Sequence, residues 1–306
     1  MHLESPIIIT SVNKKQIRNY IKQQTPVVLK NFAHRWKAQK LWTPEYLQNK
    51  IKDAKVPLYN NVKSDAYTPV NTADDYVSFS DYIQHLLKHP EHKWRLFLFN
   101  IYTHAPELLK DFDYPTDVIS PIVKQAPMLF IGGKGSITHL HFDIDYSTVL
   151  HVQIFGRKKF LLFPFNQQHL LYRKPFEVLS WVDFSNYAER INELETEFPK
   201  LKEVKGYEVV LEPSDALIMP PGFWHHIEYL ENSIAISMRA INTSPIGILK
   251  GLWYLIGMRN IDTFMKKYFP IYWNNYKVKH TPYFDSALKE KFLLTNSLSK
   301  SLSPQL

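Results

Sequence analysis

Two short segments of the chain carry residue types that bind divalent metals. The first, Thr-His-Leu-His-Phe-Asp, ends at Asp143 and contains His139 and His141. Because alternate residues of a β-strand share a face, these three side chains point the same way if the strand is regular. The second, Pro-Pro-Gly-Phe-Trp-His-His, supplies another imidazole, His225, just after a tight turn. Two imidazoles and one carboxylate suit divalent iron and leave coordination positions open for other ligands.

An isolated His-x-Asp pattern is weak evidence for a metal, because His141 and Asp143 would equally well form a buried hydrogen bond. The order of the two segments strengthens the evidence. The His-x-Asp pattern stands in the first half of a β-rich region, and His225 stands near its end, before one further strand. Such an order closes a jelly roll around a central site. The sequence therefore predicts a metal site of His141, Asp143 and His225, with His139 as an alternative fourth ligand and His226 as a structural residue.

The region around these segments reads as short strands separated by turn formers, among them Gly156, Pro213 and Asn232. One helical insert, at residues 185–203, interrupts the strands, and neither an internal repeat nor a nucleotide-binding glycine loop occurs. Strands that do not alternate with helices favour a sandwich or barrel over a parallel α/β sheet. The expected core strands cover residues 127–131, 136–143, 147–155, 158–163, 207–211, 216–219, 224–230 and 233–238.

The chain divides into a helix-and-strand region at residues 1–125, a jelly-roll core at 126–242, C-terminal helices at 243–294 and a Ser-rich, disordered tail at 295–306. We therefore expect a mainly β protein with a double-stranded β-helix core and helices at both flanks. Outside the core, helical signals cover residues 13–24, 44–51, 82–87, 106–111, 246–258 and 261–269, and strand signals cover 26–30, 56–60 and 95–99.

The composition excludes several classes of site and narrows the class of partner. The chain has 306 residues, 45% of them hydrophobic and 14% aromatic, which is ample for a large core. It has no cysteine, which excludes disulfides, thiolate zinc sites, iron–sulfur clusters and cysteine nucleophiles. A net charge of +8 and a pI of about 9.2 leave nucleic acid open as a partner, but the basic residues are dispersed. With no secretory signal and no apolar run that spans a bilayer, we expect a soluble, cytoplasmic protein without a membrane partner.

Three motifs together resemble the JmjC, cupin-like 2-oxoglutarate oxygenases, particularly those that hydroxylate proteins. The motifs are Thr-His-Leu-His-Phe-Asp at 138–143, Gln-Ile-Phe-Gly-Arg-Lys at 153–158 with Leu-Phe-Pro at 162–164, and Asp-Ala-Leu-Ile-Met-Pro-Pro-Gly-Phe-Trp-His-His-Ile-Glu at 215–228. The resemblance extends over roughly residues 26–238. Each motif is weak alone, but their order and spacing fit this family closely.

The resemblance implies a role for each matching residue. His141, Asp143 and His225 match the iron-binding triad at which catalysis takes place. Thr138 and Lys158 match the hydroxyl and the lysine that bind the distal carboxylate of 2-oxoglutarate, a dianion that needs a buried cation at that end. The resemblance thus implies Fe(II), 2-oxoglutarate and O2, and hydroxylation of a C–H bond in a protein or peptide side chain with release of succinate and CO2.

Three positions depart from the family pattern. Val149 and Arg239 stand where relatives commonly carry Asn, and Phe97 stands where a Tyr often helps to hold the distal carboxylate. Changes around a metal site tune affinity without abolishing metal binding. Arg239 is expected to give a second positive charge to 2-oxoglutarate or to an acidic substrate group; the alternative is an arginine that reaches outward to solvent.

Two other functions remain open on the same fold. One is hydroxylation of RNA or tRNA, or removal of an N-methyl group, and the basic pI favours a nucleic-acid substrate. The other is a non-redox, metal-binding cupin in which His139 is a ligand and Lys158 is incidental. The expected partner is a protein or peptide, and residues 65–75 and 173–181 are expected to shape its groove.

The C-terminal apolar run predicts an interface between two copies of the chain. Ile246, Leu249, Leu252, Trp253 and Ile256 crowd one short helix, which is more apolar than a lone surface helix needs to be. Related hydroxylases often dimerise through such helices, so the resemblance also implies a homodimer.

Overall fold

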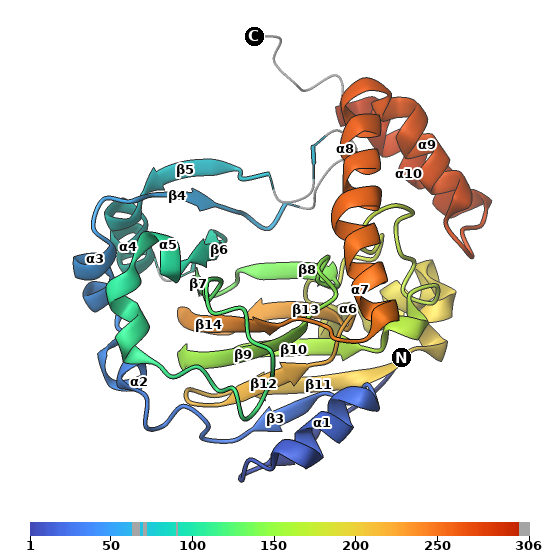
Figure 1. Ribbon diagram of the computed structural model, residues 1–306. Coiled ribbons are helices and arrows are strands. Elements are labelled where there is room, and N and C mark those ends of the chain that lie inside the picture. Colours follow the sequence, from blue (N-terminus) through green and yellow to red (C-terminus); the bar gives the residue numbers. More distant parts are fainter. Residues whose placement is uncertain (63–67, 70–71, 90, 300–306) are drawn as a thin grey trace.

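The computed structural model shows two large β-sheets packed face to face, with helices and a separate two-stranded sheet around them (Figure 1). The structure describes residues 1–62, 68–69, 72–89 and 91–299. The strands are β1 (His2–Glu4), β2 (Ile7–Ile9), β3 (Val27–Leu29), β4 (Lys55–Leu58), β5 (Asp75–Ser78), β6 (Arg95–Asn100), β7 (Met128–Gly132), β8 (Ile137–His141), β9 (Thr148–Phe155), β10 (Lys158–Phe163), β11 (Lys205–Leu211), β12 (Ala216–Met219), β13 (Trp224–Tyr229) and β14 (Ser233–Ala240).

The jelly-roll core expected from the sequence is confirmed. The eight core strands divide into two antiparallel sets, β11-β10-β13-β8 and β12-β9-β14-β7. Strands from the N-terminal region extend both sets, which gives a five-stranded sheet that begins with β1 and a seven-stranded sheet bounded by β2 and β6. The N-terminal region therefore completes the sheets of the core.

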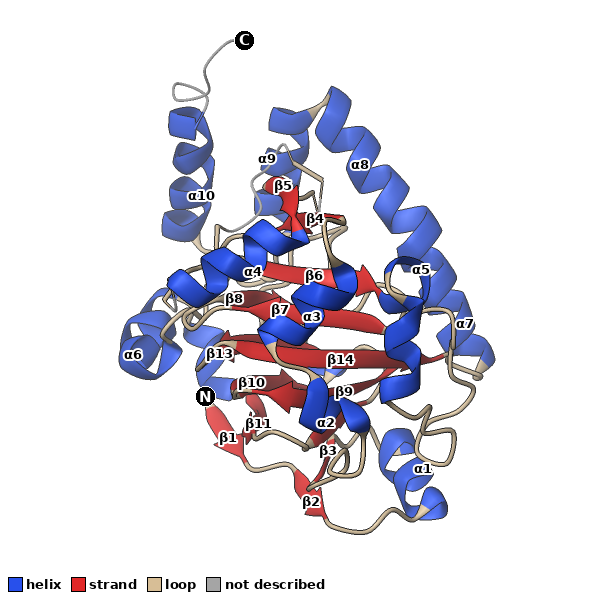
Figure 2. Ribbon diagram, turned by 90° about the vertical axis from the view of Figure 1, so that its left-hand side faces the viewer, coloured by secondary structure: helices blue, strands red, loops and turns tan. Residues whose placement is uncertain are grey.

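Helices cover the outer faces of both sheets. N-terminal helices lie across the seven-stranded sheet (Figure 2), and the insert and the C-terminal helices pack on the five-stranded one. The helices are α1 (Lys14–Lys22), α2 (Lys37–Leu41), α3 (Pro44–Ile51), α4 (Phe79–Lys88), α5 (Ile101–His104), η1 (Pro106–Asp111), η2 (Phe165–Gln167), α6 (Tyr187–Glu197), η3 (Pro199–Glu203), α7 (Pro245–Leu252), η4 (Trp253–Met258), α8 (Arg259–Tyr268), α9 (Pro270–His280) and α10 (Ser286–Ser299).

Local sequence explains where several of these helices begin. The Asn13 side chain accepts hydrogen bonds from two backbone N–H groups of α1, and Thr43 caps α3, where Pro44 takes the first position. Ser78 caps α4 in the same way. Side-chain oxygens at these ends satisfy N–H groups that the helix itself leaves unpaired.

Buried apolar side chains form three layers. The middle layer lies between the sheets and includes Phe160, Leu162, Leu217 and Ile227. The second lies between the seven-stranded sheet and the N-terminal helices, and the third between the five-stranded sheet, the insert and the C-terminal helices. The two sheets therefore pack together through an apolar layer, and helices support each sheet from its outer side.

The C-terminal region differs from expectation. The two helices predicted at 246–258 and 261–269 form one continuous helix, because a π-helical segment, Trp253–Met258, joins α7 to α8. Helix α10 runs to Ser299 and so extends into the tail predicted to be disordered from 295, and residues 300–306 lie outside the described part. Aromatic packing of α10 against the preceding segment accounts for this, since Phe292 stacks on Phe284 at 5.4 Å.

Among the described residues, no helix has the length and apolar character that crossing a bilayer requires. Of the two segments expected to shape a substrate groove, the first is 65–75, and its residues 65–67 and 70–71 lie outside the described part. The other, 173–181, runs beside β8, with Leu179 bridged to His141.

Candidate metal centre

The three predicted metal ligands converge at one end of the space between the sheets. His141 ends β8, His225 lies on β13 as its direct register partner, and Asp143 follows β8 by two residues. One ligand atom from each residue lies within 4.8 Å of the others, and the two imidazole rings are 4.1 Å apart. The sequence-predicted triad is thus brought together.

A β-bulge separates His139 from the ligands. A step of two residues on β13, from His225 to Ile227, pairs with a step of three on β8, from His141 to Thr138. The extra residue on β8 aligns both Thr138 and His141 with the inner face, so the regular alternation expected here is wrong. His139 points the other way, and the alternative in which it is a fourth ligand does not fit the structure.

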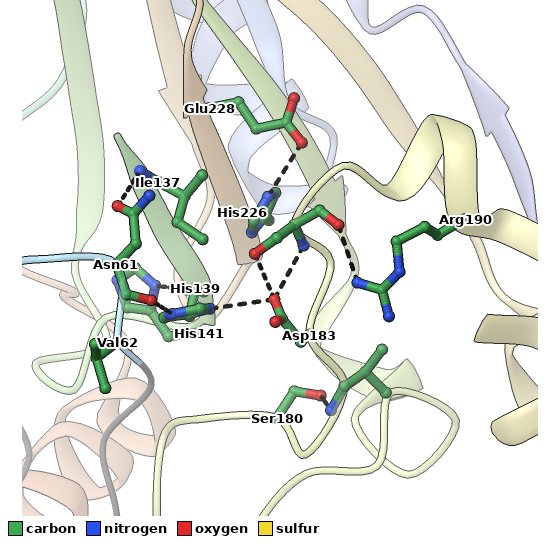
Figure 3. A network of polar contacts seen from close by, with 12 residues as sticks. Asn61, Val62, Ile137, His139, His141, Ser180, Asp183, Arg190, His226 and Glu228 are labelled. Atoms are coloured by element: carbon green, nitrogen blue, oxygen red, sulfur yellow. Dashed lines mark hydrogen bonds and ion pairs between the residues drawn. The ribbon is translucent and has the colours of Figure 1, made fainter. Parts of the chain in front are cut away.

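His139 instead ties β8 to two neighbouring segments (Figure 3). Its Nε2 lies 2.8 Å from the backbone oxygen of Asn61, and its Nδ1 lies 3.6 Å from a carboxylate oxygen of Asp183, just before the insert. Asn61 also accepts a hydrogen bond from the backbone of Ile137 at 2.8 Å and donates one to Gly135 at 2.9 Å. The strand that carries the first ligand is therefore held on its outer side as well.

His226 also lies outside the site. It is fully buried on the opposite face of β13 from His225, with its Nε2 3.5 Å from Glu228. Its ring packs 6.1 Å from the ring of Phe184, just before the insert. These contacts place it among the structural residues of the outer layer.

Both ligand imidazoles present an unprotonated nitrogen to the site. Nδ1 of His141 lies 2.8 Å from the His139 carbonyl, and Nδ1 of His225 lies 3.1 Å from the Phe223 carbonyl. A carbonyl only accepts, so Nδ1 carries the proton and Nε2 is left as the donor to a metal. Burial, reinforced by His225, lowers the pKa of His141 to about 3, and burial lowers the pKa of His225 as well.

Asp143 is ionised although it is buried. Burial raises its pKa, but Arg239 and the two histidines outweigh this and hold the pKa at about 2. Arg239 donates from Nη2 to Asp143 Oδ1 at 3.1 Å, and its Nε lies 3.0 Å from Asp145 Oδ2. The guanidinium thus faces the site with 14% of the side chain exposed, which contradicts the solvent-facing alternative. A direct contact of Arg239 with 2-oxoglutarate remains a prediction.

Lys158 lies at the inner end of the space between the sheets. Its side chain is fully buried, and within the described residues its Nζ has no hydrogen-bond partner. Burial lowers its pKa well below the ordinary lysine value. The neighbouring Lys159 points outward and pairs with Glu228 at 2.6 Å. A buried amine without an acidic partner is costly, so the pocket fits an anion that supplies one.

Two residues of this pocket were missed from the sequence. Arg95 on β6 is buried; its Nη1 donates to the Asn60 carbonyl at 2.7 Å, whereas its Nε has no partner among the described residues. It is the register partner of Gly132, and a Cβ on that glycine would lie 2.6 Å from the Tyr229 ring. The signal for Arg95 was a charged residue at the start of an apolar strand.

Asp145 was the second residue missed near the metal ligands. Its Oδ1 accepts hydrogen bonds from the backbone N–H and the hydroxyl of Ser147, at 3.3 and 3.0 Å. Of the three departures, Val149 lies directly across from Arg239, and the Phe97 ring packs against Tyr59 at 4.1 Å. The signal for Asp145 in the sequence would have been a second acidic residue two positions beyond Asp143.

The donor set fits a divalent metal, and the pocket fits a carboxylate. Two neutral imidazole nitrogens and one carboxylate suit Fe(II). Thr138 faces the same side as Ile227, and Lys158 is the register partner of Tyr229 two residues further along that strand. The Thr138 hydroxyl and the Lys158 ammonium group therefore lie on β8 and β10, the two strands that flank β13 and its ligand His225.

Comparisons with known proteins agree with this description. A family model described as a cupin-like domain matches residues 13–240. The chain is 27% identical over 229 residues to "Lysine-specific demethylase JMJ30" of Arabidopsis thaliana, covering 72% of this chain and 51% of that protein. It is 32% identical over 135 residues to "Arginine-specific demethylase JMJ20" of the same plant, covering 44% of this chain and 27% of that protein.

A third relative carries an oxygenase name. The chain is 24% identical over 270 residues to "2-oxoglutarate and iron-dependent oxygenase JMJD4" of Mus musculus, covering 78% of this chain and 60% of that protein. The chain spans between 27% and 60% of the length of these three relatives.

Proposed function

The chain belongs to the cupin-like domain family, and from this premise we propose that it is a JmjC-type oxygenase that uses Fe(II), 2-oxoglutarate and O2. The observation that carries the proposal is the combination of the converging triad with the buried Lys158 of the same sheet, whose Nζ has no hydrogen-bond partner in the described part of the chain. A buried lysine without an acidic partner among the described residues is costly, and one carboxylate of 2-oxoglutarate would supply that partner.

The proposed chemistry divides between the metal and the chain. Fe(II), when bound, supplies the activation of O2 and the oxidative decarboxylation of 2-oxoglutarate to succinate and CO2. His141, Asp143 and His225 would hold the metal through Nε2 atoms and a carboxylate that need not lose a proton first. Lys158 and Thr138 would bind the distal carboxylate of 2-oxoglutarate. The apolar layer between the sheets keeps bulk water from the inner end of the pocket.

The finer proposal is hydroxylation of a C–H bond in a protein or peptide side chain. The names of two relatives specify lysine and arginine, which supports a protein substrate. Removal of an N-methyl group begins with the same attack on a C–H bond, so the substrate group decides between the two outcomes. Hydroxylation of RNA is the alternative that the net charge of +8 favours.

The test is an anaerobic titration with Fe(II) and 2-oxoglutarate, followed by exposure to O2 and mass spectrometry of candidate substrates. We expect succinate to form and a protein or peptide to gain one oxygen. Loss of a methyl group would identify a demethylase, and oxidation of RNA with a steep salt dependence would identify the nucleic-acid alternative. Absence of succinate with every substrate would favour the non-redox, metal-binding cupin.

The cytoplasmic location stays a prediction, which imaging of the tagged protein tests.

A further inference from the structure

Arg239 lies between two carboxylates, only one of which is a predicted metal ligand. Its Nη2 donates to Oδ1 of Asp143 at 3.1 Å, and its Nε lies 3.0 Å from Oδ2 of Asp145. Asp145 is itself fixed, because its other oxygen accepts the hydroxyl and the backbone N–H of Ser147. A chain of polar contacts therefore runs from Ser147 through Asp145 and Arg239 to the ligand carboxylate.

We propose that Arg239 and Asp145 form a compensating ion pair that orients the Asp143 carboxylate and sets the charge of the metal centre. The inference rests on the proposed function only in assuming that His141, Asp143 and His225 bind a divalent metal. Arg239 and Asp145 are positioning residues in this assignment, since they act through Asp143.

The orientation follows from the hydrogen bond. Because Oδ1 of Asp143 accepts the Arg239 guanidinium, Oδ2 is the oxygen that is freer to bind a metal. Charged hydrogen bonds of this kind fix a carboxylate more firmly than neutral ones do. Groups that hydrogen-bond to ligands typically change metal affinity about tenfold to a hundredfold when they are removed.

The charge balance follows from the second carboxylate. A guanidinium bonded to a ligand repels a divalent cation, and by itself would weaken metal binding. Asp145 cancels the positive charge of Arg239, whose Nε lies 3.0 Å from its Oδ2. Asp143, Arg239 and Asp145 together then carry one net negative charge, as Asp143 alone would. Burial lowers the pKa of Arg239, yet Asp143 and Asp145 raise it above its ordinary value, so the guanidinium stays charged.

Opposite effects of two substitutions test the proposal. In Arg239→Gln an amide can still donate to Asp143, but the positive charge is lost and Asp145 is left uncompensated, so Co²⁺ should bind about tenfold more tightly. In Asp145→Asn the charge of Arg239 is uncompensated, so Co²⁺ should bind about tenfold more weakly. The double variant should return close to the wild-type affinity, because it removes one charge of each sign.

Calorimetry with Co²⁺ measures the affinities, and the visible absorption of bound Co²⁺ reports whether the ligand geometry changes. Arg157→Gln is the matched control, because Arg157 pairs with Glu231 at the end of β10 that lies away from His225, and its loss should leave Co²⁺ binding unchanged. Arg239→Lys keeps the charge without the two-pronged contact, so it should alter the spectrum more than the affinity.

Three outcomes separate this inference from the proposed function. Equal Co²⁺ affinity in all variants, or a shift of the same sign in both single variants, would overturn the compensating pair. A wild-type protein that binds no Co²⁺ would instead contradict the metal centre itself. If Arg239→Gln fails to fold, the Asp145→Asn and Arg239→Lys measurements still decide, since unchanged affinity and spectrum in both would overturn the proposal.

Discussion

The ammonium nitrogen of Lys158 lies 4.4 Å from the centroid of the Tyr229 ring, on neighbouring strands of the five-stranded sheet. The ring of Phe130, from the opposite sheet, lies 5.9 Å away on another side. Aromatic faces attract a cation, but a buried amine still lacks the hydrogen-bond acceptors that water would supply. Lys158 and the Tyr229 ring therefore form a preorganised binding site for an anion.

Replacing Lys158 by Met should raise the concentration of 2-oxoglutarate needed for half-maximal succinate formation by about a hundredfold, since losing one partner of a buried charge pair costs about 2–5 kcal/mol. Metal affinity should change little, because Lys158 makes no contact with a ligand of the triad. Lys159→Met is the matched control, since Lys159 pairs with Glu228 instead. Equal 2-oxoglutarate dependence in Lys158→Met and wild type would remove Lys158 from the site.

The pH dependence of stability gives a second test of Lys158 without any ligand. Burial lowers the pKa of Lys158 in the folded protein, so the unfolded chain binds more protons at any pH between the two pKa values. Above the ordinary lysine pKa of about 10.4, Lys158 is neutral in both states and its protonation does not lower the free energy of unfolding. As the pH falls below that value, the unfolded chain gains the proton first, so the free energy of unfolding decreases. The wild type should therefore gain stability relative to Lys158→Met as the pH rises toward 10, by at most about 1.4 kcal/mol per pH unit between the two pKa values. Denaturant titrations of both proteins measure this, and parallel curves would contradict it.

His141→Ala or Asp143→Ala should abolish iron binding and succinate formation while the fold is kept, because each removes one of three ligands. Metal analysis and a succinate assay measure the loss, and circular dichroism checks the fold. Normal succinate formation in either variant would refute the triad.

His139→Ala is expected to behave differently, since the bulge turns His139 away from the metal. It should keep its iron but lose roughly 1–3 kcal/mol of stability, the usual cost of leaving buried hydrogen-bonding groups unpaired. Denaturant unfolding measures the stability and metal analysis the iron content. Loss of iron with unchanged stability would restore His139 as a ligand.

The contrast between His139 and His141 shows how far the sequence predicts the site. Residue types and spacing were enough to identify the triad, because ligand chemistry depends on them. The bulge was not predictable, since it depends on how β8 pairs with β13 and on the contacts of His139 with Asn61 and Asp183. Each of these partners is distant in the sequence, and a one-residue change in register turns a side chain to the other face.

The same distinction applies to the fold. The eight core strands were predictable because turn formers and apolar alternation mark their ends locally. The bounds of helices α9 and α10 were not, because what holds them is distant: Phe176 packs on Trp273 of α9 at 5.0 Å, and Trp181 packs on Phe292 of α10 at 4.8 Å. Asp145 was missed for a related reason, since its importance depends on Arg239, which the fold brings from the far strand β14.

The outer face of the long C-terminal helix, opposite the body of the protein, is apolar and exposed. Its inner face packs closely, with Gly247 against Asn242 and Gly251 against the backbone of Asp145. On the outer face the first four exposed side chains follow one another at steps of three and four residues, the spacing of helices that pack together in pairs, and the fifth lies two turns further along. They are Ile246, Leu249, Trp253, Ile256 and Phe264, each more than half exposed.

We therefore propose that a second copy of the chain covers this face, and that the double substitution Leu249→Glu and Ile256→Glu prevents dimerisation. Leu249 is 67% exposed and Ile256 is 60% exposed in the single chain, so the charges should disturb the monomer fold little. Light scattering at micromolar concentration should give the mass of two chains for the wild type and of one for the variant. Val12→Glu, at an exposed apolar position before α1, is the control and should stay dimeric. A wild type with the mass of one chain, or a variant that remains a dimer, would place the interface elsewhere.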